Sequence, residues 1–208
     1  MRGVLEAADA AFRRRGGIAA YLVAAFSIAY AIVYLGLVRT DATNAGAATL
    51  SWALIAAGAL AAAMATAGLA SFIGGAAGTF LAALGVGYSL LAAAHGAFAA
   101  IGIAQGFADL DLSPTDPRGF ATFGLAGAWM LLTGLELRQR TDLRRMYWQL
   151  AVAGGSDLIF LFIATVVGST PLILLTGGLA SVILGPAFWL MTGRLLTAEP
   201  IQPEPHSP

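Results

Sequence analysis

Residues 42–108 contain no Asp, Glu, Lys or Arg. A single membrane-spanning helix needs about 20 mostly apolar residues, so this uncharged stretch is long enough for two. The whole chain of 208 residues is 59% hydrophobic and only 11% charged, whereas soluble domains carry about 25% charged residues. The sequence therefore predicts an integral membrane protein in contact with the lipid bilayer.

Composition also excludes several kinds of chemistry. The formal net charge is zero, so there is no overall basic field to attract nucleic acid. Cysteine is absent, which excludes disulfides, thiol nucleophiles and iron–sulfur clusters, and every basic residue is Arg. A phosphate-binding loop that ends in Lys and a retinal Schiff base are therefore excluded too. No His/Glu cluster has metal-ligand spacing, so we expect no metal and no cofactor.

The apolar stretches divide into six predicted helices. The uncharged stretch breaks at a Gly-rich segment, residues 71–78, and the last long apolar stretch breaks at residues 168–171. The predicted spans are residues 16–38, 49–70, 79–104, 119–135 and two more within 146–193. Alternation of polar and apolar residues is missing, so strands are not expected. The predicted fold is an all-α bundle of six transmembrane helices over residues 16–196.

Arginine placement predicts the orientation, because cytoplasmic loops of membrane proteins are enriched in Arg and Lys. With the N-terminus inside, only Arg39 and Arg118 lie outside, and the acidic Asp109, Asp111 and Asp116 fall in an outer loop. The expected location is a bacterial inner membrane with both termini cytoplasmic. Residues 1–15 form a basic cytoplasmic segment, either an amphipathic interfacial helix or a simple positive anchor. Residues 197–208 are Pro-rich and predicted to be a flexible tail.

Two sets of residues hint at an internal repeat. Trp52, Leu54 and Gly58 have the same spacing as Trp148, Leu150 and Gly154, and residues 17–21 resemble residues 119–123. Two three-helix halves would have opposite orientations in the membrane, an arrangement common among transporters. Chance similarity between Ala- and Gly-rich helices is the alternative interpretation.

Asp157 is the sharpest candidate for a functional residue. It lies about ten residues into the fifth predicted span, roughly 15 Å deep at about 1.5 Å per residue. A carboxylate at that depth costs at least about 2.5 kcal/mol and usually faces the bundle interior or a cavity. The functional hypothesis is a proton, cation or substrate site. The structural alternative is a neutral Asp that holds two helices together by a hydrogen bond.

Three further polar side chains are candidates for substrate or proton binding. His95, in the third span, could share a proton with Asp157, and Tyr88 lies on the same helix face as His95. Tyr30, in the first span, needs a hydrogen-bond partner and either lines a polar cavity or packs in the core. In the sixth span, Pro186 is expected to kink the helix.

Tryptophans near span ends are expected at the membrane interface. Trp52, Trp148 and Trp189 fit this expectation, whereas Trp129 lies in the middle of its span. The segment Gly154-Gly155-Ser156-Asp157 departs from the Gly-x-Ser-Gly loop of intramembrane serine proteases, and no complete set of catalytic residues is found. An enzyme is therefore the least favoured interpretation.

Two segments, residues 116–125 (Asp-Pro-Arg-Gly-Phe-Ala-Thr-Phe-Gly-Leu) and 184–189 (Leu-Gly-Pro-Ala-Phe-Trp), carry a resemblance to a known group. They resemble segments of small bacterial six-helix membrane proteins that are domains of unknown function. The resemblance covers mainly the second half of the chain. It implies a six-helix fold but no activity and no site residues.

Two functions from different classes remain open at this stage. The first is transport or permeation of a small solute, proton or ion through a bundle with a carboxylate at its midplane. The second is a non-catalytic accessory or scaffolding subunit that binds other membrane subunits or a second copy of the chain. Short loops and small-residue helix faces favour the second, while Asp157 favours the first.

Overall fold

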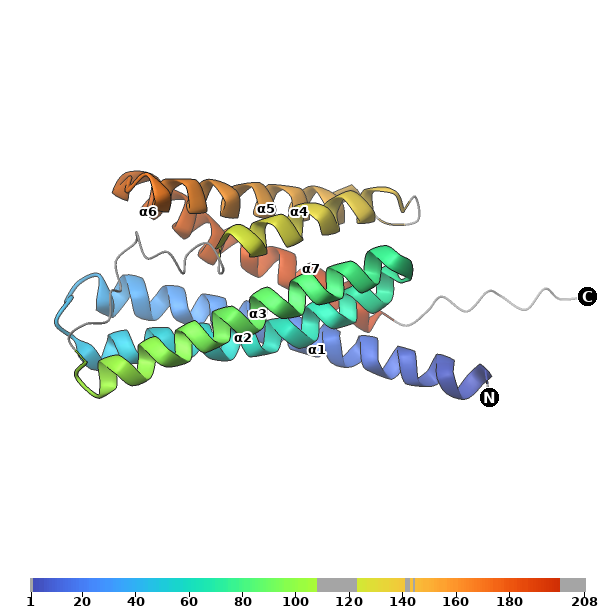
Figure 1. Cartoon of the computed structure of the whole chain (residues 1–208), viewed down its shortest axis with the longest axis horizontal. Helices are drawn as coiled ribbons and strands as arrows, with labels where there is room; N and C mark the ends of the chain where they lie inside the picture. Colours follow the sequence, from blue (N-terminus) through green and yellow to red (C-terminus); the bar gives the residue numbers. More distant parts are fainter. Residues whose placement is uncertain (1, 108–122, 141–142, 144, 199–208) are drawn as a thin grey trace, which may run out of the picture.

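The protein is all-helical throughout the part of the chain that our computed structural model describes, which is residues 2–107, 123–140, 143 and 145–198. Figure 1 shows the helices packed lengthwise in a bundle. Their bounds are α1 Arg2–Val33, α2 Ala45–Ile73, α3 Gly75–Ala104, α4 Leu125–Arg138, α5 Arg145–Val166, α6 Thr170–Leu179 and α7 Gly185–Thr197. The π-helical segments η1 Tyr34–Val38 and η3 Ala180–Leu184 extend α1 and join α6 to α7.

Among the described residues, five helical stretches are long and apolar enough to cross a membrane: Ala8–Val38, Ala45–Ile73, Gly75–Ala104, Arg145–Val166 and Thr170–Thr197. The multi-pass helical prediction is confirmed at this level. The predicted span over residues 119–135 corresponds to α4, which has 14 residues and ends at Arg138. Residues 119–122 lie outside the described part, as do the acidic residues 109, 111 and 116 and the tail after residue 198. The predicted N-terminal segment forms one helix with the first span, without a break after residue 15.

The turns lie where glycine and proline predict them. Gly74 and Gly75 have φ values of 71° and 63°, a left-handed conformation that side chains with a Cβ disfavour, and they separate α2 from α3. Gly168 has a φ of 68° after α5, and Pro171 stands in the first turn of α6, where its missing N–H costs no helix hydrogen bond. Both predicted breaks are therefore confirmed.

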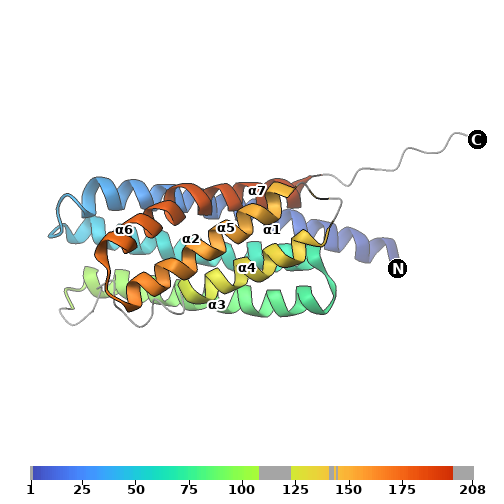
Figure 2. The same ribbon diagram turned by 90° about the horizontal axis from the view of Figure 1, so that it is seen from above.

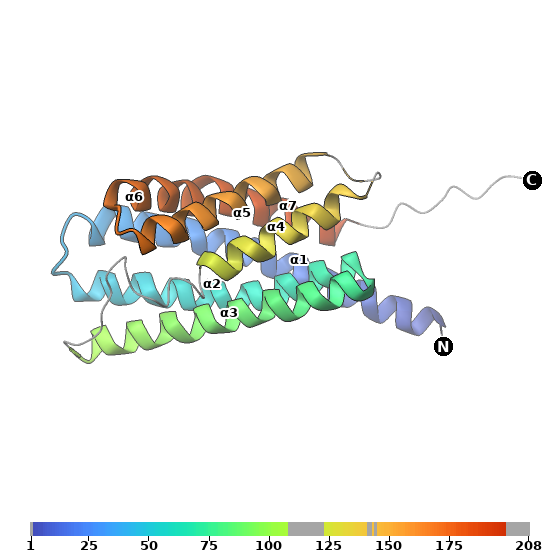
Figure 3. The ribbon, with the colours of Figure 1, turned by 45° about the horizontal axis from the view of Figure 1, so that its top comes forward.

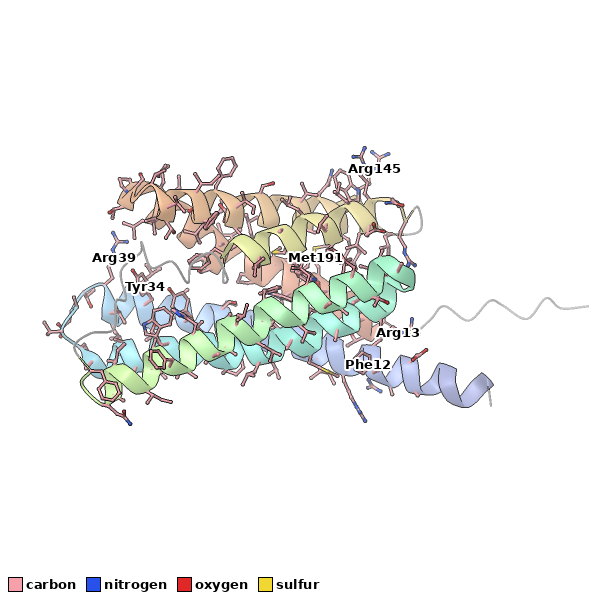
Figure 4. All side chains as sticks on the ribbon, in the orientation of Figure 1. Phe12, Arg13, Tyr34, Arg39, Arg145 and Met191 are labelled. Carbon is pink, nitrogen blue, oxygen red and sulfur yellow. The ribbon has the colours of Figure 1, made fainter. Side chains whose placement is uncertain are left out.

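The arginines separate by bundle end. Figure 4 shows Arg13 and Arg145 toward one end and Arg39 at the other. The start of α1 and the end of α7 lie at the same end as Arg13 and Arg145 (Figure 1). At this end Arg140 donates to the carbonyls of Phe72 and Ile73, the last residues of α2.

Glycines allow neighbouring helices to touch through their backbones. A Cβ at Gly16 would lie 2.8 Å from the Cα of Gly68, so α1 and α2 are in close contact. A Cβ at Gly155 would lie 2.8 Å from the carbonyl oxygen of Gly127, which brings α4 and α5 equally close. Small residues at interfaces are how helices approach one another in lipid, where no hydrophobic force drives them together.

Two groups of helices make up the bundle. Figures 1 and 3 show α2 and α3 side by side in one group and α4 and α5 in the other. The groups meet where α7 packs along α1, visible in Figure 2, and where α3 contacts α4. In each case the first helix of one half packs against the last helix of the other.

Aromatic rings fill the centre where the two halves meet. Trp129 is 1% exposed, and its Nε1 donates to the carbonyl of Leu81 in α3 at 3.1 Å. Trp189 stacks on Trp129 with ring centroids 5.8 Å apart, and Phe188 meets both rings edge-on. The prediction that Trp189 lies at the membrane interface is wrong, because its ring is buried in this core.

The last span is interrupted halfway. The N–H of Gly185 donates to the carbonyl of Ala180, five residues back, instead of to the carbonyl four residues back. A Cβ at Gly185 would lie 2.5 Å from that oxygen, so glycine is required here. Pro186 follows directly in the first turn of α7. The expected disturbance at Pro186 is therefore found as a π-helical segment, η3.

Candidate functional site

Asp157 is buried near the middle of α5. Its side chain is 7% exposed, and its Oδ2 atom has no hydrogen-bond partner among the described residues. A buried polar group without a partner costs about 1–3 kcal/mol, and more if it is charged. Such groups are rare in native proteins, so the unpartnered carboxyl oxygen makes Asp157 the leading candidate for a functional residue.

The contacts of its neighbours place Asp157 beside η3. One turn before it, a Cβ at Gly154 would lie 3.9 Å from the Cβ of Leu184. One turn after it, Leu161 Cδ1 lies 3.7 Å from where a Cβ of Gly177 would be. As the residue number in α5 rises from 154 to 161, the number of the contacted residue falls from 184 to 177, so the two segments are antiparallel. Asp157 is therefore level with the residues midway between 177 and 184. Ser181 is at that midpoint, inside the π-helical segment, and α5 packs directly against η3.

Backbone carbonyls are left without their usual donors at this level. In an α-helix the N–H of residue 186 would bond the carbonyl of Val182, and in a π-helix that of Ser181. Pro186 has no N–H, so neither carbonyl receives a hydrogen bond from this position. The buried carboxyl group therefore lies beside a stretch of helix in which the Ser181 and Val182 carbonyls lack the donor that residue 186 would otherwise supply.

No charged side chain of the described helices packed on α5 lies at this depth. In α4 the charged residues are Glu136 and Arg138, in its last turn. From Thr170 to Leu184 there is none, and α7 carries only Arg194, also in its last turn. The lining contributed by the neighbouring positions is apolar, from Met130, Leu161 and Leu184. Asp157 therefore has no counter-ion among these helices.

The structure does not bring His95 to Asp157. α3 packs against α2 and α4, whereas α5 packs against α4, α6, η3 and α7. The His95 ring lies edge-on to Trp52 of α2, with centroids 5.0 Å apart. The close approach at Gly96, where a Cβ would lie 3.1 Å from the carbonyl of Trp52, holds this part of α3 against α2. The proposed proton-sharing pair is therefore not formed.

The two tyrosine candidates also lie apart from Asp157. Tyr88 is buried against Trp129, with ring centroids 5.7 Å apart, and belongs to the aromatic core. Tyr30 stacks on Tyr34 in the same helix, with centroids 5.6 Å apart. Among the described residues no three His, Cys, Asp or Glu side chains come together as metal ligands.

The sequence indicates Asp157 as a candidate but does not indicate which residues surround it. Ser181 is one of three small residues, with Gly177 and Gly185, that recur every four positions in the last span, and Pro186 lies five positions beyond it. That spacing is the available signal, because a proline removes the donor for the carbonyls four and five residues before it. Nothing in one sequence indicates that this segment packs against the carboxyl group.

Comparisons of the chain with profiles of protein families, with curated proteins and with solved structures found no match. The resemblance to small six-helix membrane proteins therefore stays a prediction. Of the two segments that carry it, residues 116–122 lie outside the described part, and residues 184–189 run from the end of η3 into α7.

Proposed function

We propose that this chain is a membrane transport or permeation protein in which Asp157 binds a proton or another cation. One observation carries the proposal: a carboxyl group, buried in a membrane helix, has an unpartnered oxygen and lies beside a helix interruption. Transporters build ion sites near the midplane from such interruptions, where freed carbonyls face the ion. Intramembrane carboxylates serve as relays in many pumps and transporters.

The competing function is that of an accessory or scaffolding subunit. The glycine contacts and the aromatic core favour it, because they give a closely packed bundle without needing any transported species. In that case Asp157 should act as a structural bond between helices. Its Oδ2 has no partner among the described residues, which argues against a permanent bond of this kind.

The proposed setting is a bacterial inner membrane with six spans, two inverted halves and both termini cytoplasmic. The collection of arginines at one end of the bundle supports this orientation. The contacts of α1 with α7 and of α3 with α4 support two related halves. In an inverted repeat, the first helix of each half would contact the last helix of the other half, and these are the two contacts. Reporter fusions after residue 208 and within residues 109–116 test the orientation. A periplasmic signal from the C-terminal fusion would contradict it.

The test of function uses two variants of one residue. Asp157→Asn keeps the shape and can still form hydrogen bonds, but it cannot ionise. We expect Asp157→Asn to fold normally and lose pH-dependent flux in liposomes, and Asp157→Leu to lose flux entirely. If Asp157 is purely structural, Asp157→Asn should leave flux and stability unchanged. Asp157→Leu should then lower the stability by about 1–2 kcal/mol, because an interhelical hydrogen bond is lost. Proton or solute flux that is unchanged in both variants would overturn the proposal.

A further inference from the structure

The cation that this site takes can be specified further, on the assumption that the proposed transport function holds. We infer that Asp157 binds a proton, and that the protonated carboxyl group donates a hydrogen bond to a carbonyl of Ser181 or Val182 that Pro186 leaves without a helix donor.

The supply of oxygen ligands decides between a proton and a metal cation. Hard cations such as Ca²⁺ and Mg²⁺ are held by about six or more oxygens. The side chains at the positions that frame Asp157 are Met130, Leu161 and Leu184, and none of them carries an oxygen. The oxygens that the contacts of α5 with η3 bring level with Asp157 are the Ser181 hydroxyl and the carbonyls of Ser181 and Val182. A proton needs no further ligand than the carboxylate itself and one acceptor.

The surroundings also favour a neutral carboxyl group. The groups that could face it with charge are Glu136 and Arg138 on α4, Arg194 on α7 and Arg145 on α5 itself, and all of them lie in terminal turns. The described residues thus provide no nearby charge to balance a carboxylate. Transfer of a bare charge into an apolar interior costs far more than transfer of a neutral, hydrogen-bonded group.

The acceptor follows from the geometry of the interrupted helix. Gly185 donates to the carbonyl of Ala180, so the next carbonyl along, that of Ser181, would have to be served by residue 186. Residue 186 is proline and has no N–H. Protonation consumes one proton from water and yields a neutral acid. Its O–H then satisfies one of the free carbonyls, and deprotonation returns the proton to water.

Labelling with a hydrophobic carbodiimide tests the inference in proteoliposomes. The reagent reacts with a protonated carboxyl group: the acid proton moves to a reagent nitrogen, and the carboxyl oxygen bonds to the reagent's central carbon. We expect mass spectrometry to find the adduct on Asp157, to a decreasing extent as the pH rises, with no protection by Na⁺. The control variant Asp157→Asn should not be labelled at this position.

Each outcome decides a separate point. Protection by Na⁺ would overturn the proton assignment while leaving an ion site, as the proposed function requires. Absence of labelling at every pH would also overturn the proton assignment. Normal pH-dependent labelling in a protein without any flux would support the proton site and contradict the transport function instead.

A proline pair tests the acceptor. Pro186→Ala supplies an N–H that competes for the same carbonyls, so we expect the midpoint of pH-dependent labelling to fall by about half to one pH unit, the size of one hydrogen bond. Pro171→Ala is the matched control, since Pro171 stands in the first turn of α6 and frees no carbonyl there. Equal midpoints in Pro186→Ala and the parent protein would overturn the assigned acceptor.

Discussion

The two halves of the bundle use the same packing and differ in what they bury. α2 and α3 have 29 and 30 residues and no helix interruption, and residues 42–108 are free of Asp, Glu, Lys and Arg. In the second half the equivalent last helix is divided into α6, η3 and α7, and the middle helix carries Asp157. Both halves use glycine for close contact, so glycine content reflects packing. The interrupted last span and the buried intramembrane carboxyl group both lie in the second half of the described chain.

The matched residues of the two halves occupy comparable places. Gly58 of α2 faces the preceding helix, where a Cβ would lie 3.3 Å from the Cβ of Phe26. Gly154 of α5 also faces its preceding helix, where a Cβ would lie 2.5 Å from Met130 Cε. Each of these two glycines therefore faces the helix that precedes it in the chain.

The largest expected effect comes from breaking the core between the halves. Trp129→Ala removes a fully buried ring and its bond to Leu81, and such truncations cost about 3–5 kcal/mol. We expect a large drop in the free energy of unfolding, measured in detergent. Trp129→Phe keeps most of the ring and should lose only about 1 kcal/mol for the missing hydrogen bond. Equal losses in both variants would show that the ring's packing contributes little.

Glycine substitutions then compare the halves directly. A Cβ at Gly155 would lie 2.7 Å from the backbone nitrogen of Leu131, and one at Gly68 would lie 2.8 Å from Gly16 Cα. We expect Gly155→Val and Gly68→Val to destabilise by about 1–3 kcal/mol each, because backbone atoms cannot move aside cheaply.

The controls for this comparison are open glycines. Gly87 and Gly178 have no atom within 4 Å of an added Cβ. Gly87→Ala and Gly178→Ala should be neutral or stabilise by about 0.4–1 kcal/mol. A neutral Gly155→Val beside a damaging Gly68→Val would contradict equal packing in the two halves.

A smaller effect is expected at the charged link between the halves. Arg140 follows α4 and donates to the last carbonyls of α2, where a positive charge also complements the helix dipole. Arg140→Gln should cost about 0.3–1 kcal/mol. Thermal unfolding at low and high salt measures it, and the difference from the parent protein should shrink as salt screens the charge.

The smallest effect belongs to the exposed turn before α2 in the first half. The hydroxyl and the amide of Thr43 donate to Asp41 Oδ1, which lowers the pKa of this carboxyl group. Because the pKa is lower in the folded turn than in the unfolded chain, the ionised carboxyl group stabilises the turn at pH values above the unfolded pKa. This stabilisation is lost as the pH falls through the pKa of the folded state. Hydrogen exchange at the Thr43 amide, corrected for intrinsic rates, should show less protection at low pH. Asp41→Asn should remove the pH dependence.

The sequence predicts the helices and their breaks because local chemistry sets them. Uncharged length indicates a span, and Gly74, Gly168 and Pro171 mark the turns. The buried position of Asp157 also follows from the sequence alone, since a carboxylate in the middle of a span must face inward.

The partners of these residues could not be predicted, because they depend on how helices pack. His95 and Asp157 share a compatible chemistry, but α3 and α5 lie against different neighbours. Trp189 looks interfacial from its distance to the end of the chain's last span, yet it stacks on Trp129 from another helix. The freed carbonyls follow from Pro186, but their position beside Asp157 depends on the contact between α5 and η3.

Water access to Asp157 is the most direct test of the central claim that a proton or another cation reaches this residue. The chain has no cysteine, so Ser181→Cys and Val182→Cys can each be probed without background using a water-soluble, membrane-impermeant thiol reagent. The Val182 side chain is 47% exposed on the bundle surface, where lipid should cover it. If a cation reaches Asp157 from water, we expect the reagent to modify Ser181→Cys and not Val182→Cys. Absence of reaction at Ser181→Cys from either side of the membrane would contradict it.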